Sequence, residues 1–288
     1  MKFDEYRQYD ATGLAGLIER GEVTGEMLLD LAIQRVEVVN DELNALLHPL
    51  YDQAREQLRS GVSGPLAGVP LLVKDLFQEI EGAPHYKGNR ALKDTDHRAA
   101  RDATLVQRWK AAGLVPFGRT NTPEFGAKGV TEPEAFGACR NPWNTGHTPG
   151  GSSGGSAALV AAGAVPAAGA NDGGGSIRIP AACCGLFGLK PGRGRTPWGP
   201  EFTEAQHGMA VNHVLTRSVR DSARILDQTH GEETGSLFRI APPLGRYTDA
   251  AARSPGKLRI AFSTASPLGM SVDPEAVKAA EDTARLLQ

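Results

Sequence analysis

Two stretches decide the fold: residues 150–156 read Gly-Gly-Ser-Ser-Gly-Gly-Ser, and residues 171–180 read Asn-Asp-Gly-Gly-Gly-Ser-Ile-Arg-Ile-Pro. Their glycines allow backbone conformations that other residues avoid. A flexible linker has a similar composition, but the first stretch runs directly into an alanine-rich helix predicted for residues 156–162. It is not a phosphate-binding P-loop either, because no Gly-Lys-Ser/Thr follows. Both stretches therefore predict loops of defined conformation at a functional site.

Around these loops, predicted strands alternate with predicted helices. Short apolar runs predict buried strands at residues 69–73, 114–117, 165–170 and 258–262. Helical patterns occupy residues 104–112, 156–162, 218–228 and 274 onward, and three earlier helices are predicted, two capped by Asp10 and Thr24 and one at residues 50–58. Residues 123–149, 192–215 and 230–256 show few regular patterns. This order predicts an α/β fold with helices on the faces of a sheet.

Composition excludes several classes of function. The chain has 288 residues, 40% of them hydrophobic, and a formal net charge of −2. Its charges are mixed, so no basic stripe points to nucleic acid, and no apolar run reaches the length of about 20 residues that spans a bilayer. The polar N-terminus does not resemble a signal peptide. Three cysteines and no metal-ligand motif predict a reducing, cytoplasmic setting without a structural metal.

Two segments carry residues suited to acyl transfer. Lys74 ends the apolar run at residues 71–73, and burial favours the neutral amine that a general base requires. The alternative is a lysine that reaches solvent from a strand end. The consecutive glycines at residues 173–175 direct several backbone N–H groups to one place, as an oxyanion hole requires, and Ser176 follows them. A tight turn is the alternative there.

Together these motifs resemble the amidase signature family, over residues 68–199 and more loosely over residues 14–262. The resemblance implies an α/β fold with a mixed sheet covered by helices on both faces. One domain would fill residues 1–288, with a helical region at about 1–65, a catalytic core at about 66–200 and an incomplete remainder. Family members are longer, so we expect the C-terminal part of the sheet to be missing. Residues 131–134 and 171–172 most resemble hydrolases of 6-aminohexanoate oligomers and cyclic dimers.

The resemblance also implies roles for individual residues. Ser176 would be the nucleophile, Ser152 the bridging serine after a cis peptide bond, and Lys74 the base. The expected oxyanion hole consists of the backbone N–H groups of Gly173, Gly174, Gly175 and Ser176. Gly173 stands where many members carry a larger residue, which would loosen this loop. The expected supporting residues are Ser153, Asp172 and Arg178. The substrate would be a small amide, with no cofactor, nucleic acid or membrane involved, and a homodimer is allowed.

Other interpretations stay open at this stage. Residues 151–155 also fit the GxSxG nucleophile elbow of α/β-hydrolases, with Ser153 as the nucleophile, but that elbow should follow a strand. A glutaminase resembling the ammonia-releasing component of the glutamyl-tRNA amidotransferases is a second alternative. An inactive amidase fragment that keeps its triad is a third.

Overall fold

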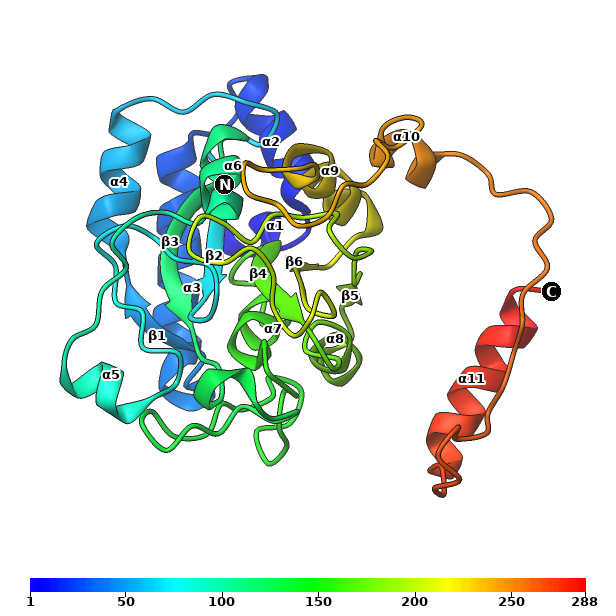
Figure 1. Ribbon diagram of the computed structural model, residues 1–288. Helices are drawn as coiled ribbons and strands as arrows, with labels where there is room; N and C mark the ends of the chain where they lie inside the picture. The colour runs from blue at the N-terminus through cyan, green and yellow to red at the C-terminus, as the bar shows by residue number, and fades with distance from the viewer. The chain divides into compact units, whose positions relative to one another are not determined.

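The computed structural model describes residues 1–288, which divide into a large unit, Met1–Ala252, and a small unit, Arg253–Gln288. The large unit is built on one six-stranded sheet with the strand order β1-β3-β2-β4-β6-β5 (Figure 1). The strands are β1 (Leu46–Pro49), β2 (Pro70–Lys74), β3 (Val115–Thr120), β4 (Ala167–Asp172), β5 (Phe187–Gly188) and β6 (Val211–Thr216).

The sheet is mixed, as the resemblance implied. Strand β2 is parallel to both β3 and β4, whereas β1, β6 and β5 join by antiparallel pairing. Leu72 of β2 is paired with Ala168 of β4. Because parallel strands end at the same edge of a sheet, the last residues of β2 and β4 meet there, where ligands of α/β proteins commonly bind.

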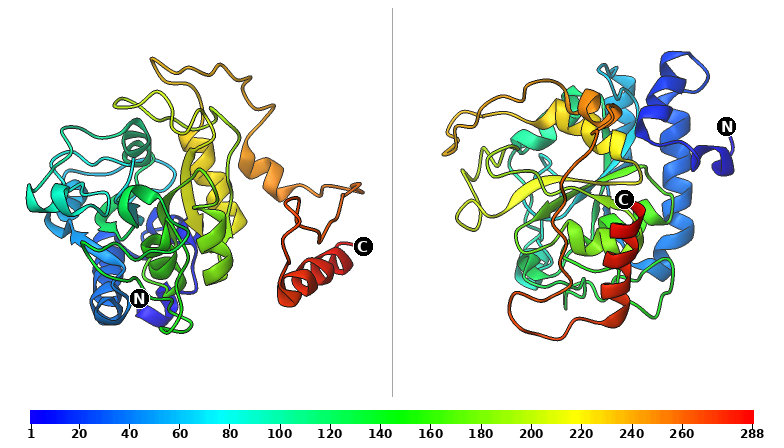
Figure 2. Two further views of the ribbon diagram at one scale, coloured as in Figure 1. Left: turned by 60° about the horizontal axis from the view of Figure 1, so that its bottom comes forward. Right: turned by 90° about the vertical axis from the view of Figure 1, so that its right-hand side faces the viewer.

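Helices surround this sheet (Figure 2). They are α1 (Phe3–Tyr6), α2 (Ala11–Glu19), α3 (Gly25–Leu43), α4 (Tyr51–Arg59), α5 (Arg90–Asp94), α6 (Thr104–Ala111), α7 (Gly154–Ala161), α8 (Arg178–Cys184), α9 (Val219–Thr229) and α10 (Tyr247–Ala252), with the 3₁₀ turn η1 (Glu124–Gly126). Helix α6 crosses from β2 to β3 and α7 from β3 to β4, which lie on opposite sides of β2. Right-handed crossovers therefore place these two helices on opposite faces of the sheet.

The core consists of apolar side chains from the central strands and the helices against them, including Leu71, Leu72, Val73, Phe117 and Trp109, all fully buried. Helix α7 approaches the sheet very closely. A Cβ atom on Gly155 would collide with the backbone of Asn121. The absence of a side chain at Gly155 thus permits the close approach of α7 to Asn121. This approach places Ser152, just before α7, near the ends of the strands.

Most predicted elements are present, and several corrections are needed. Asp10 and Thr24 cap α2 and α3 as expected. The strand predicted at residues 258–262 does not form. The sequence interpretation missed α1, β1, α5, α8, β5, α10 and the six-residue strand β6 within residues 192–215. Strand β6 was missed because polar Asn212 and His213 interrupt its apolar pattern, although both are buried.

The small unit contains one regular element, α11 (Pro274–Leu286), capped by Asp273. Its helix is the one expected from Pro274 onward. Across the whole structure, no helix is both long enough and apolar enough to cross a membrane.

Candidate active site

The ends of β2 and β4 bring two polar side chains to the start of α7. Lys74, the last residue of β2, is fully buried. Its Nζ lies 2.6 Å from Ser152 Oγ and 2.7 Å from Asn171 Oδ1, and donates a hydrogen bond to each. The peptide bond between Gly151 and Ser152 is cis, which confirms the prediction. The structure therefore joins the predicted base and bridging serine, and adds an asparagine to them.

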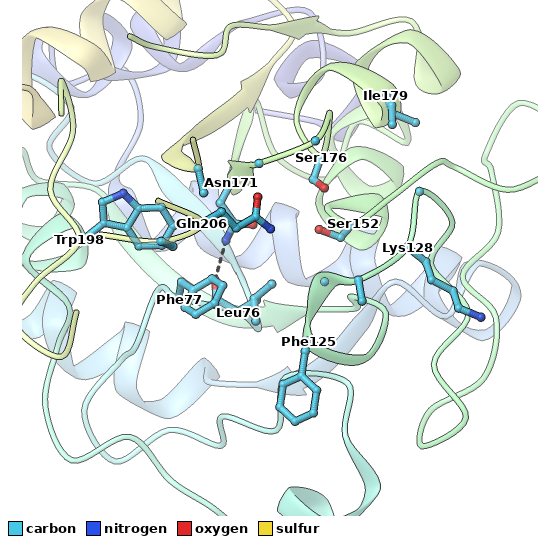
Figure 3. A pocket seen from close by; sticks show the side chains of 17 residues that line it. Leu76, Phe77, Phe125, Lys128, Ser152, Asn171, Ser176, Ile179, Trp198 and Gln206 are labelled. Atoms are coloured by element: carbon cyan, nitrogen blue, oxygen red, sulfur yellow. Dashed lines mark hydrogen bonds between the residues drawn. The ribbon is translucent and has the colours of Figure 1, made fainter. Parts of the chain in front are cut away.

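Asn171 is the second hydrogen-bond partner of the amine, beside Ser152. Its Nδ2 donates to the carbonyl of Leu76 at 2.8 Å (Figure 3), and this bond turns Oδ1 toward Lys74. The acceptor is uncharged, so it orients the amine without the attraction of a carboxylate. When Lys74 loses its proton, it can keep one N–H on Asn171, and its lone pair can then accept a hydrogen bond from the hydroxyl of Ser152.

The third predicted residue, Ser176, lies in the same pocket. Its hydroxyl and that of Ser152 face one another in Figure 3, and both residues line the cavity. The structure contains no direct hydrogen bond between the two hydroxyls. The three residues of the predicted triad are thus gathered, with Lys74 and Ser152 bonded and Ser176 facing Ser152.

Burial decides the charge of Lys74. Desolvation lowers its pKa well below the ordinary value, as predicted, and the negative charge of Asp172 opposes that shift. Asp75 turns away, and its Oδ1 pairs with the buried Arg119 at 3.1 Å.

The carboxylate of Asp172 is strongly stabilised. Burial raises its pKa, but hydrogen bonds from the side chain of Arg178 and from the backbone N–H groups of Ile177 and Arg178 lower it to about 2. Arg178 Nε and Nη2 each lie 2.9 Å from an oxygen of Asp172. Lys190 Nζ lies 3.4 Å from Oδ1. Two cations thus flank this acid, which anchors the loop that ends in Ser176.

That loop presents unused donors to the pocket. None of the backbone N–H groups of residues 173–176 donates a hydrogen bond within the protein, whereas those of Ile177 and Arg178 both bind Asp172. Gly173, Gly174 and Ser176 line the pocket. Free N–H groups beside a serine hydroxyl are what stabilises a developing oxyanion.

Gly173 makes room for another side chain. A Cβ atom at this position would collide with the side-chain amide of Gln206. Gln206 therefore occupies the space left by the missing side chain. The expectation that Gly173 loosens the loop stays a prediction.

The pocket itself has a volume of about 400 Å³. Its walls include Leu76, Phe77, Phe125, Ile179 and Trp198, with Gln206 at one side (Figure 3). Lys128 is the one charged side chain among its lining residues. This lining suits an uncharged, partly apolar ligand with a few polar groups.

Sequence reasoning missed several of these residues. Phe77, Phe125 and Gln206 line the pocket and have positive φ angles of 55°, 50° and 52°. Such backbone conformations are uncommon for bulky residues and gather at functional sites. No sequence pattern marks them. Asn171 did carry a signal, because a polar pair at the end of a buried strand is unusual.

The position of Ser153 disfavours the elbow interpretation. Its side chain is fully buried, and Oγ donates to the carbonyl of Asn171 at 3.4 Å. It does not line the pocket, and no strand precedes it in residues 143–150. Ser153 instead links the start of α7 to the end of β4, which is consistent with a supporting residue.

Comparisons with known proteins agree with the family resemblance seen in the sequence. The family model described as Amidase matches residues 27–288. A 6-aminohexanoate-cyclic-dimer hydrolase of Paenarthrobacter ureafaciens is 45% identical over 282 residues, which cover 96% of this chain and 57% of the relative. The solved structure of a 6-aminohexanoate cyclic dimer hydrolase has a TM-score of 0.94 at 44% identity, covering 98% of this chain and 59% of that one.

A more distant structure bears on the glutaminase alternative. The corresponding component of the glutamyl-tRNA(Gln) amidotransferase of Thermotoga maritima is 28% identical, with a TM-score of 0.65, and the match covers 84% of this chain and 49% of that one. The chain spans less than two thirds of each relative's length. The greater similarity lies with the cyclic-dimer hydrolases.

Proposed function

The chain belongs to the amidase signature family, and we propose that it hydrolyses C–N amide bonds through an acyl-enzyme on Ser176. One observation carries the proposal: a fully buried lysine amine lies 2.6 Å from the hydroxyl of Ser152, which faces Ser176 in one pocket. A lysine with a lowered pKa can act as a base at neutral pH, and a serine relay transfers its effect to the nucleophile.

In this mechanism the protons move along the triad. Neutral Lys74 takes the proton of Ser152, while Ser152 takes that of Ser176. Ser176 Oγ then bonds to the amide carbon, and the carbonyl oxygen gains negative charge. When the C–N bond breaks, Ser152 protonates the leaving amine and recovers its proton from Lys74. Water attacks the acyl-enzyme by the same relay and releases the carboxylic acid and Ser176.

The loop at residues 173–176 supplies the oxyanion hole in this proposal. Its backbone N–H groups have no other partner, so they are available to the developing charge. Asp172 and Arg178 hold the loop in shape by paired hydrogen bonds, and Ser153 fixes the start of α7.

For the substrate we propose an uncharged linear or cyclic amide or oligoamide. The pocket walls combine apolar and aromatic side chains with polar ones, and the names of the similar cyclic-dimer hydrolases give a cyclic amide dimer as their substrate. The three free cysteine thiols support a cytoplasmic setting for this reaction.

Labelling tests the proposal directly. The purified chain is treated with a fluorophosphonate, the modified residue is identified by peptide mass spectrometry, and turnover is measured on linear and cyclic amides. We expect the adduct on Ser176, lost in Ser176→Ala and kept in Ser153→Ala. An adduct on Ser153, or unchanged amide turnover by Ser176→Ala, would overturn the triad. Labelling of Ser176 without turnover of any amide would support the inactive-fragment alternative.

A further inference from the structure

Lys190 lies behind the free N–H groups of the loop and outside the proposed triad. It follows β5 by two residues, and β5 is paired with β6, so its backbone is tied to the sheet. Its Nζ donates a hydrogen bond of 2.7 Å to the carbonyl oxygen of Gly173 and lies 3.4 Å from Asp172 Oδ1. The Lys190 side chain thus contacts both the loop backbone, at Gly173, and Asp172, the acid that anchors the loop.

The bond to Gly173 fixes the direction of the next N–H group. In a trans peptide the C=O of one residue and the N–H of the following residue point in opposite directions. The peptide between Gly173 and Gly174 is trans, because the cis bonds of the chain lie elsewhere. Since Lys190 holds the Gly173 carbonyl, the Gly174 N–H points away from Lys190. Gly174 itself lines the pocket.

A second peptide of the same loop is fixed in an equivalent way. The carbonyl of Gly175 accepts a hydrogen bond of 2.7 Å from the N–H of Ile179, at the start of α8. The Ser176 N–H therefore points away from that helix turn. One carbonyl of the loop is held by a helix and the other by a side chain. Without Lys190, the peptide joining two glycines would have little else to fix its orientation.

We propose that Lys190 is a positioning residue for the reaction, which aims the Gly174 N–H at the oxyanion by holding the carbonyl of Gly173. This inference rests on the proposed function. Because its effect concerns charge that develops only during the reaction, removing Lys190 should slow the chemical step and leave substrate binding nearly unchanged.

The test uses a graded series at one position. Lys190→Met removes donor and charge, Lys190→Gln keeps a donor without charge, and Lys190→Arg keeps both. The matched control is Lys93→Met, because Lys93 Nζ also donates to a backbone carbonyl, that of Ala135 at 2.7 Å, and neither residue lines the pocket. The measurements are kcat and KM on an amide that the wild type cleaves, and the rate at which a fluorophosphonate labels Ser176.

We expect Lys190→Met to lower kcat and the labelling rate by roughly 10-fold to 100-fold, with KM changed less than about twofold. Lys190→Arg should recover most of the loss, Lys190→Gln part of it, and Lys93→Met should match the wild type. In ¹H–¹⁵N spectra the amide signal of Gly174 should move in Lys190→Met and stay in Lys93→Met.

Other results overturn the inference in distinguishable ways. Wild-type rates in Lys190→Met, or a raised KM with unchanged kcat, would reject the positioning role. Equal damage in all three variants, with a lower melting temperature, would show a purely structural lysine. If Lys190→Met fails to fold, the kcat values of Lys190→Gln and Lys190→Arg are compared instead. A lower kcat in Lys190→Gln supports the positioning role, and equal values reject it. A wild type whose Ser176 is never labelled would reject the proposed function itself, and this inference with it.

Discussion

The neutral side chain of Asn171 gives the sharpest test of how Lys74 is kept basic. Asn171→Asp replaces an amide oxygen by a carboxylate oxygen of nearly the same shape, 2.7 Å from a fully buried amine. The new negative charge should hold the proton on Lys74. We therefore expect the variant to fold and to bind substrate. At neutral pH, however, Lys74 should stay protonated and be unable to act as the proposed base.

The structure gives the size of this effect. Two unit charges 2.7 Å apart attract by about 6 kcal/mol at an effective dielectric constant of about 20. Each 1.4 kcal/mol changes the ratio of neutral to protonated amine about tenfold, so the upper bound is about four powers of ten. Burying the new carboxylate costs several kcal/mol and offsets part of this gain. We expect the reactivity of Ser176 at pH 7 to fall by roughly 100-fold to 10,000-fold.

The assay follows fluorophosphonate labelling of Ser176 between pH 6 and 10, which requires no knowledge of the natural substrate. In the wild type the pKa of Lys74 is lowered, so the rate should climb from acid to mildly alkaline pH as the neutral amine forms. In Asn171→Asp that pKa rises, so the same limb should move to higher pH. The unfolding midpoint is measured alongside to separate loss of reactivity from loss of fold.

An uncharged variant supplies the control. Asn171→Leu removes both hydrogen bonds of the side chain without adding charge, and leaves the carbonyl of Leu76 without its donor. We expect a stability loss of about 1–3 kcal/mol and a smaller fall in rate, with no shift of the limb to higher pH. If Asn171→Asp were labelled at pH 7 within about threefold of the wild type, the argument that a neutral acceptor is required would be refuted.

Three further predictions concern the triad, the loop and the fold. Lys74→Arg should abolish measurable turnover, because a guanidinium stays protonated; substantial activity would make Lys74 a structural cation. Gly173→Ala should lower the labelling rate at least tenfold by pushing Gln206 aside, and adding Gln206→Ala should restore part of it; no recovery would mean that the collision is not the cause. Asp10→Ala should destabilise the fold by about 1 kcal/mol at pH 7. Because its ion pair and caps lower the pKa of Asp10 to about 2, that loss should fade as the pH falls from about 4 toward 2 in urea unfolding curves.

The strands that carry the site were readable from sequence because they are apolar runs with clear ends. Strands β2 and β4 were predicted within two residues, and each ends in polar side chains. Strand β6 was not predicted, because its Asn212 and His213 look like loop residues. In the fold His213 Nε2 lies 2.8 Å from Ser222 Oγ, and the side-chain Nδ2 of Asn212 donates to the carbonyl of Pro197 at 3.4 Å. Partners distant in sequence make these polar residues tolerable in a buried strand.

At residues 258–262 the sequence predicted a strand that the structure does not contain. Leu258, Ile260 and Phe262 alternate as a half-buried strand should, yet no strand forms there. Alternation states only which face would be buried. A strand also needs a neighbour to accept its backbone hydrogen bonds, and sequence pattern does not supply one.

The buried position of Lys74 was predictable, but its surroundings were not. Lys74 is marked by the apolar run before it, and the glycine-rich loops mark the two serines. The contact from Asn171 to Lys74 depends on the turn after β2, where the carbonyl of Leu76 orients the amide. The role of Asp172 as the nearest influential acid likewise depends on strand pairing across the sheet.

The end of β4 shows why two polar residues stand together in a buried strand. Neighbouring side chains of a strand point to opposite sides. Asn171 faces the amine and offers an uncharged oxygen, so Lys74 can lose its proton. Asp172 faces the loop, where a full charge is useful because it binds the N–H of Ile177 and the side chain of Arg178. Exchanging the two residue types would keep Lys74, the proposed base, protonated and would also release the loop, so their order along the strand follows from the chemistry on each side.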